Sequence, residues 1–326
     1  MPGSRRLEIN LRPATFDDAK MVADLESARD PEDPRDPDML RFWWRAHTSG
    51  EVNARFVAER EGRAIAFVGA VHESWTGMRE RFGSVRPVLH PDTWTANDFS
   101  QLVRQGEDWL VSEEGQVSVV RMREDFTKEL DVLRGMGYVE VRRQKIWELD
   151  LVAGRERLLA EALRQRHLMQ EHGVEMHPLS DDKDPDRLTK LYGITVEAEK
   201  DIPTTVPWQT MSLAEWKRFW FTNPALREDR FWIAREGEAI VGLSVLQFPP
   251  VRGLPWTMFT GTSRSVRGRG VARALKYETI AQAIELGYDR IRTSNDGANA
   301  PILHLNEEVG YRLVSPVIEL HRRLVS

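Results

Sequence analysis

Three short motifs of this chain occur twice, in the same order and about 175 residues apart, and this repeat constrains the fold more than any other feature. The matching pairs are Arg41-Phe42-Trp43-Trp44 with Arg218-Phe219-Trp220-Phe221, Arg60-Glu61-Gly62-Arg63-Ala64-Ile65 with Arg235-Glu236-Gly237-Glu238-Ala239-Ile240, and Met136-Gly137-Tyr138 with Val309-Gly310-Tyr311. A length of 326 residues fits two units, because domains commonly have about 100–200 residues. The sequence therefore predicts two copies of one structural unit.

Each copy has the pattern of an α/β fold with a mixed sheet. Apolar periodicity predicts a short first strand, two amphipathic helices, a strand meander, and then helices that alternate with strands. A meander followed by strand–helix–strand crossovers is typical of such a sheet. We predict a first domain at 1–152, a connecting helix at 153–173 and a second domain at 174–326. The helix either packs on its own chain or forms a dimer contact, so a monomer and a homodimer both remain open.

The composition excludes several kinds of chemistry. The chain has no cysteine, which removes a thiolate nucleophile, a cysteine-bound acyl intermediate and a thiolate zinc site. A net charge of −5 argues against a nucleic-acid partner. No apolar run is long enough to span a bilayer, and the first residues lack the apolar core of a signal peptide, so we expect a cytoplasmic protein without a membrane partner. The histidines show no metal-ligand spacing, and no metal is expected.

The strongest chemical signal lies between a predicted strand, Pro255–Thr262, and a predicted helix, Arg273–Gly287. The intervening segment contains Arg267-Gly268-Arg269-Gly270-Val271-Ala272. Glycines let backbone amides approach a ligand, and the helix dipole and two arginines add positive charge. The segment has neither the Gly-x-Gly-x-x-Gly pattern of dinucleotide-binding folds nor the Gly-Lys-Ser/Thr of triphosphate loops. We predict a site for an anionic diphosphate.

Residues downstream give the second copy a resemblance to the GNAT N-acetyltransferases. The acyl-CoA loop of that family, Arg/Gln-x-x-Gly-x-Gly/Ala, matches Arg267–Ala272, and the later asparagine, helix and Gly-Phe/Tyr ending match Asn299, Gly310 and Tyr311. The resemblance covers about 174–324 and, more faintly, about 7–151. The repeated sequence is similar to the double-domain, mycothiol-synthase-like type of the family. This resemblance implies two tandem GNAT folds.

The resemblance implies transfer of an acetyl group from acetyl-CoA to the primary amine of a small molecule, by direct attack in a ternary complex. Many family members use a tyrosine as the acid that protonates CoA, and Asn306 occupies that position here. Asparagine cannot donate a proton at neutral pH, so an acyl-CoA-binding sensor or interaction protein without catalysis is the alternative function. The implied CoA-binding residues are Thr260, Gly261, Thr262, Arg267, Gly268, Arg269, Gly270, Val271, Ala272, Asn299 and Asn306.

The general base and the amine site are less well defined by the sequence. The predicted strand Pro255–Thr262 contains no carboxylate. Trp208, in a loop stiffened by two prolines, is a candidate wall of the amine site. The candidates for the base are Glu197, Glu199, Asp201, Asp296 and His304.

The first copy departs from the family at the phosphate loop. Trp94 stands where the family has arginine, no glycine remains in the loop, and Ala96, Asn97 and Asp98 add side-chain bulk and a negative charge. The negative charge of Asp98 would repel a diphosphate. We therefore predict a degenerate first domain, which serves either as a scaffold or as a lid over the second.

Overall fold

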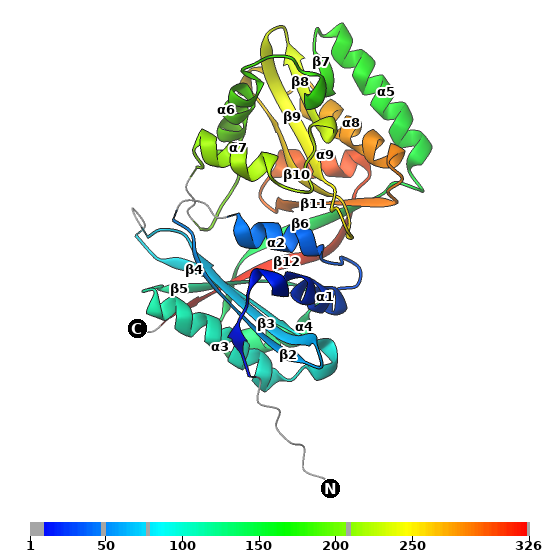
Figure 1. The fold of residues 1–326 in the computed structure, drawn as a ribbon. Helices are drawn as coiled ribbons and strands as arrows, with labels where there is room; N and C mark the ends of the chain where they lie inside the picture. Colours follow the sequence, from blue (N-terminus) through cyan, green and yellow to red (C-terminus); the bar gives the residue numbers. More distant parts are fainter. Residues whose placement is uncertain (1–9, 47–49, 76–78, 207–209, 325–326) are drawn as a thin grey trace. The chain divides into compact units, whose positions relative to one another are not determined.

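The computed structural model of the chain describes residues 10–46, 50–75, 79–206 and 210–324. They form two compact units, one made of Met1–Arg142 with Val317–Ser326 and the other of Arg143–Pro316. The chain passes from one unit to the other within two long strands, β6 (Val139–Asp150) and β12 (Arg312–Arg323) (Figure 1). No helix in the described ranges is both long and apolar enough to cross a membrane.

The first unit is a mixed sheet with helices on both faces. Its elements are β1 (Arg12–Pro13), η1 (Phe16–Asp18), α1 (Ala19–Arg29), α2 (Pro37–Arg45), β2 (Val52–Arg60), β3 (Arg63–His72), β4 (Phe82–Leu89), η2 (Pro91–Thr93), α3 (Ala96–Ser112), β5 (Val117–Arg123) and α4 (Thr127–Gly135), where η marks a 3₁₀ helix. The strand order is β1-β2-β3-β4-β5-β12. Neighbouring strands are antiparallel except β4 and β5, which are parallel.

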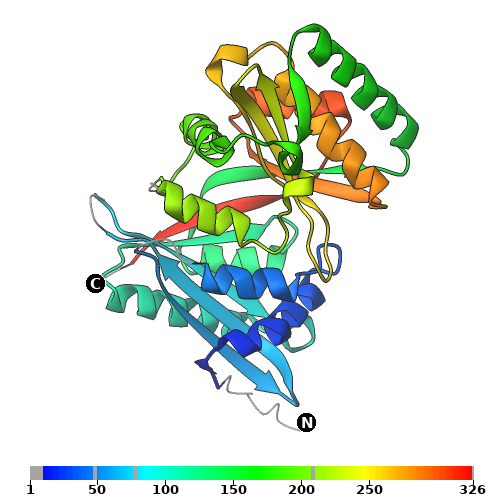
Figure 2. The ribbon, with the colours of Figure 1, turned by 45° about the horizontal axis from the view of Figure 1, so that its top comes forward.

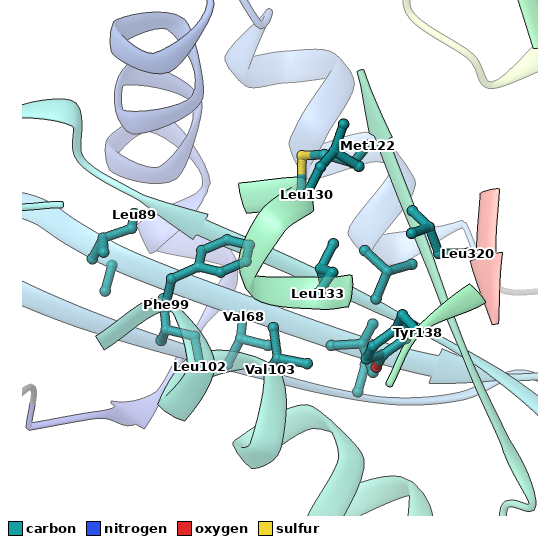
Figure 3. Packing of buried hydrophobic residues seen from close by; sticks show 14 of the residues in the cluster. Val68, Leu89, Phe99, Leu102, Val103, Met122, Leu130, Leu133, Tyr138 and Leu320 are labelled. Carbon is teal, nitrogen blue, oxygen red and sulfur yellow. The ribbon is translucent and has the colours of Figure 1, made fainter. Parts of the chain in front are cut away.

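Alternating side chains of this sheet pack against different helices, as strand geometry requires. On β3, Phe67 belongs to the apolar cluster that includes α1 and α2. Its neighbours Ala66 and Val68 belong to the cluster of α3 and α4 on the other face. Figure 3 shows Val68 close to Leu102 and Val103 of α3. The sheet of the first unit thus has a helix pair on each side.

The second unit repeats this plan. Its elements are α5 (Arg155–Glu171), β7 (Glu175–Pro178), η3 (Leu179–Asp181), α6 (Arg187–Glu199), α7 (Leu213–Phe221), η4 (Glu228–Arg230), β8 (Phe231–Glu236), β9 (Ala239–Gln247), β10 (Trp256–Thr262), η5 (Arg264–Val266), α8 (Val271–Glu285), β11 (Arg290–Asp296) and α9 (Ala300–Val309). The strand order is β6-β11-β10-β9-β8-β7, and only β10 and β11 are parallel.

Helices also cover both faces of the second sheet. Leu243 of β9 packs with Leu191 of α6 and Trp216 of α7. Val241, which a bulge in β9 turns to the other face of the strand, packs with Leu275 of α8. Helices α5 and α8 lie side by side (Figure 2). The predicted α/β fold with mixed sheets is confirmed.

The limits of the two units differ from the domain limits expected at 1–152 and 174–326. Strand β6 comes from the first copy of the repeat, but it pairs with β11 from Gln144↔Asp296 to Asp150↔Arg290. Strand β12 comes from the second copy, but its last residues pair with β5. Each copy therefore supplies the final strand of the unit that the other copy builds. The helix expected at 153–173 corresponds to α5, which packs on α8 of the second unit.

Candidate functional site

Strands β10 and β11 separate soon after they begin. Over the described residues, their only register pair is Trp256 with Arg292, and β11 then continues along β6 on its other side. A bulge interrupts the pairing of β10 with β9 between Thr257 and Phe259. The residues Thr257–Thr262, which we call the open edge of β10, therefore have a strand on one side only. Their backbone groups can pair with an extended ligand on the other side.

The chain leaves β10 through η5 and a turn that contains two left-handed glycines. Gly268 has φ +75°, and Gly270, the residue that precedes α8, has φ +83°. A side chain is disfavoured in this conformation. A Cβ atom built on Gly268 would meet no atom within 4 Å. These glycines are thus required by the backbone conformation of the loop rather than by crowding.

The first turn of α8 has no side-chain cap. Gly270 has no side chain with which to accept a hydrogen bond, and its carbonyl accepts only from Ala274. Within the described ranges, no acceptor pairs with the amides of Gly268, Gly270, Val271, Ala272 and Arg273. Unpaired amides at a helix start, together with the helix dipole, form an anion-binding arrangement.

Carboxylates from neighbouring elements hold the arginines of this loop. Arg267 Nη2 lies 2.6 Å from Asp201 Oδ2, and Arg269 Nη2 lies 2.7 Å from Glu236 Oε1. The hydrogen bond from Arg267 lowers the pKa of the Asp201 carboxyl. All four side chains are between 37% and 43% exposed, and such surface pairs are weak. A diphosphate could therefore displace the carboxylates and take over the arginines.

The structure separates the predicted base candidates. Glu197 accepts the backbone N–H of Arg264 at 2.8 Å and so supports the start of η5. Asp201 is paired with Arg267, and its lowered pKa makes it a weak base. Asp296 accepts the N–H of Ala298 at 2.7 Å and supports the turn before α9. These three carboxylates have structural contacts.

Glu199 has a different environment. Burial raises the pKa of its carboxyl, and that carboxyl has no hydrogen-bond partner among the residues that the structure describes. The preceding residue, Ala198, lies against β10, because a Cβ built on Gly261 would be 3.0 Å from the Ala198 Cβ. Glu199 is the next residue of α6 after this contact with the strand that contains Thr260, Gly261 and Thr262.

The remaining predicted residues lie around α9 or outside the described ranges. Asn299 precedes α9, and its carbonyl accepts the N–H of Leu303. Asn306 is fully buried and donates from Nδ2 to Asn295 Oδ1 at 2.7 Å. His304 is exposed on α9 near Glu308. Trp208 lies outside the residues that the structure describes.

Sequence reasoning missed one residue near the site. Lys276 of α8 is only 2% exposed, and burial lowers its pKa to about 7. One signal could have found it. Lys276 lies four residues after Ala272 and four before Ile280, so the lysine shares one helix face with two apolar residues. No group of three or more histidine, aspartate or glutamate residues in the described ranges is placed to hold a metal ion.

In the first unit, contacts within the protein fill the region equivalent to the phosphate loop and to the open edge of β10. Thr95 Oγ1 accepts the N–H of Asp98 at 3.0 Å and caps α3. Strands β4 and β5 pair only as far as Ser84↔Val119, so β4 also has an open edge. There Arg29 of α1 donates to the carbonyl of Pro87 at 3.2 Å, and proline has no N–H to offer. A side chain of the protein itself thus occupies this edge.

Comparisons with known proteins agree with this geometry. Residues 194–311 match the model of the acetyltransferase (GNAT) family. A GCN5-related N-acetyltransferase structure from Sphaerobacter thermophilus aligns with 96% of this chain and 95% of its own, at TM-score 0.67 and 19% identity. A tandem GNAT protein from the clavulanic acid biosynthesis pathway aligns over 96% and 98%, at TM-score 0.72 and 11% identity. A comparison with curated protein sequences gives no match.

Proposed function

We propose that this chain, a tandem GNAT protein, transfers an acetyl group from acetyl-CoA to the primary amine of a small molecule, and that the second unit contains the active site. One observation carries the proposal. The uncapped start of α8, with two left-handed glycines and two arginines, directly follows the open edge of β10. This combination suits a ligand that joins a diphosphate to an extended amide-containing arm.

The residues present fit acetyl-CoA. The unpaired amides of Gly268 and of Gly270 to Arg273, with the side chains of Arg267 and Arg269, would hold the diphosphate. The backbone of Thr260–Thr262 would pair with the amides of the pantetheine arm, as in strand addition. Acetyl-CoA supplies the activated thioester, and the chain supplies binding, orientation and proton transfer.

Two groups of the chain serve the chemistry in this proposal. Glu199 takes a proton from the ammonium form of the acceptor, because its half-buried carboxylate is a better base than an ordinary glutamate. Backbone N–H groups of the open edge donate to the carbonyl oxygen at which negative charge develops. The absence of cysteine is consistent with direct attack by the amine.

The test is release of CoA thiol from acetyl-CoA with a panel of amines. Gly270→Glu should abolish acetyl-CoA binding, because it puts a side chain in a left-handed position and a negative charge beside the diphosphate site. Asn97→Glu is the matched control, because Asn97 is exposed in the first turn of α3, and it should bind normally. Unchanged binding by Gly270→Glu would contradict this site.

The same assay separates catalysis from a sensor function. The buried Asn306 at the position of the family's tyrosine acid is the observation that favours a sensor. Tight acetyl-CoA binding without turnover of any amine would support that alternative. Turnover of at least one amine supports the enzyme.

A further inference from the structure

Helix α8 buries a lysine for which the fold supplies no counter-charge. The Lys276 side chain has no hydrogen bond or ion pair with any described residue, and its Nζ lies 4.7 Å from the centre of the Tyr311 ring. Burial alone lowers the pKa of Lys276 to about 7. Burying an amine whose one favourable contact is a cation–π contact with an aromatic ring opposes folding, so its presence calls for a role.

Charged groups on the surrounding elements are engaged elsewhere or lie at the surface. Strands β9 and β10 contain no charged residue. Tyr277 and Tyr311 are the titratable neighbours without formal charge, and burial raises the pKa of both. The charged groups of α8, α5, β11 and β8 form ion pairs with other residues: Glu278 with Arg166, Glu161 with Arg164, Arg292 with Glu148, Arg235 with Asp182, and Glu236 with Arg269. Glu307 and Glu308 of α9 are exposed.

The position of Lys276 connects it to the acyl-CoA site by two routes. It lies one helical turn beyond Ala272, a residue of the phosphate-loop motif, on the same face of α8. The Tyr311 hydroxyl is buried near Thr257, the first residue of the open edge, and makes no hydrogen bond of normal geometry with a described residue. Lys276 is thus linked through the Tyr311 ring to the start of the open edge.

Asn306 completes this group of buried polar side chains. The N–H of Tyr311 donates to the carbonyl of Asn306 at 3.0 Å. Asn306 Oδ1 is buried and has no hydrogen-bond partner in the described part of the chain. Lys276 and Asn306 therefore retain hydrogen-bonding capacity that the folded protein does not use. Among Asn306, Tyr311 and Lys276, only the lysine can exchange a proton readily near neutral pH.

We propose that Lys276 is the acid that protonates the sulfur of the departing CoA, an inference that rests on the proposed function. The Lys276 ammonium gives one proton to sulfur, and the electron pair of that N–H bond stays on Nζ. The S–H bond forms from the electron pair that sulfur receives when the carbonyl C–S bond breaks. The neutral Lys276 amine then recovers a proton from water.

The acid strength of Lys276 suits this step. A general acid works best when its pKa is near the working pH, because enough of it is protonated and it still releases its proton readily. A lysine of ordinary pKa, near 10.5, would hold its proton too tightly. The same burial that opposes folding thus makes Lys276 a usable acid.

Two substitutions test the proton transfer. Lys276→Met keeps the length of the side chain without a proton, and Lys276→Arg keeps a positive charge that does not dissociate. Both should lower kcat by about 10²-fold or more, with little change in the KM for acetyl-CoA. Wild-type kcat in Lys276→Met would overturn the proposal. Full activity in Lys276→Arg would show that the charge matters and the proton does not, which also overturns it.

A stability measurement reports on Lys276 without any ligand. The native pKa is lowered, so the unfolded state binds more protons between about pH 7 and pH 10.5, and the stability of the wild type rises with pH across that range. Lys276→Met should therefore exceed the wild type in stability at pH 7, and the difference should shrink as the pH approaches 10.5. A difference that does not depend on pH would show that Lys276 does not titrate in this range.

The closing experiment distinguishes failure of this inference from failure of the proposed function. CoA, rather than acetyl-CoA, is bound to the intact protein, and ionisation of its thiol is followed by thiolate ultraviolet absorption. The thiol should ionise at lower pH in the wild type than in Lys276→Met, because the ammonium stabilises the thiolate. Binding with identical titrations overturns the role of Lys276 alone. Absence of CoA binding overturns the proposed function as well.

Discussion

Gly270 joins the phosphate loop to α8 in a backbone conformation that other residues adopt only at a cost. A left-handed residue other than glycine is strained by about 1–2 kcal/mol. Gly270→Ala should therefore lower the free energy of unfolding by about that amount and weaken acetyl-CoA binding. Chemical denaturation and calorimetry measure the two effects.

Gly193 supplies the control for this substitution. It lies within α6, its φ is not positive, and a Cβ built on it would meet no atom within 4 Å. Gly193→Ala should stabilise the protein by about 0.5–1 kcal/mol, because alanine favours the helix. Equal effects of the two substitutions would show that the left-handed conformation of Gly270 is not required.

Glu199 and Asp201 lie two residues apart and should respond differently to loss of charge. Glu199→Gln should lower kcat by about 10²-fold, because it removes the proposed base. In the wild type, kcat/KM should fall as the pH drops through the pKa of Glu199, which burial places above the ordinary 4.5. Asp201→Asn should keep kcat and change mainly the KM for acetyl-CoA, because its carboxylate holds Arg267. The opposite pattern in steady-state kinetics would reverse the two roles.

The sequence identifies some of these residues and not others. Arginines and glycines of the loop are recognisable because few residue types suit a left-handed turn beside an anion. The acidic candidates could not be ranked, because burial and pairing decide whether a carboxylate is a base, and neither is written in local sequence. Lys276 was missed although its position on the face of Ala272 and Ile280 can be read from the sequence, because that position does not reveal how completely the side chain is buried.

At the scale of elements, the two copies differ most in how corresponding helices begin. The amide of Asp98 in α3 is satisfied by Thr95, whereas the first amides of α8 have no acceptor in the described ranges. The edge of β4 is occupied by Arg29 of α1, and the edge of β10 is open. A diphosphate needs unpaired backbone N–H donors, and an extended pantetheine arm needs an unpaired strand edge. The second unit offers both.

These differences predict one acetyl-CoA per chain. Calorimetry on the intact protein should give a stoichiometry near one, and Gly270→Glu should remove it entirely. Asn97→Glu, in the first unit, should leave both stoichiometry and affinity unchanged. Two sites per chain, or a site that survives Gly270→Glu, would show that the first unit also binds the cosubstrate.

Elements with strong local signals were predicted well. Helix α7 begins at a capping box formed by Ser212 and Glu215, and α9 ends before the left-handed Gly310. These capping residues can be read from the sequence, because they mark helix ends directly. Strand β12 runs from Arg312 to Arg323 and pairs with β5, which lies far away in the sequence. Pairing of that kind has no local signal.

At the scale of the whole molecule, the exchange of final strands makes the repeat boundary different from the boundary of a folded unit. The seam between sequence copies is near residue 152, after β6, but β6 completes the sheet that contains β11. A compact unit therefore begins at Arg143 and ends at Pro316. The two halves of the sequence depend on each other for their sheets.

This dependence can be tested with two fragments of similar length. Fragment 143–316 retains the partner of β11 and should unfold cooperatively and bind acetyl-CoA. Fragment 153–326 lacks β6 and leaves the backbone groups of β11 unpaired on that side, a loss that opposes folding. It should be the less stable of the two in urea denaturation. Equal stability would mean that β12 can replace β6 beside β11. The exchange of strands would then follow from how the chain connects the strands, and the sequence of β6 would not be required for pairing with β11.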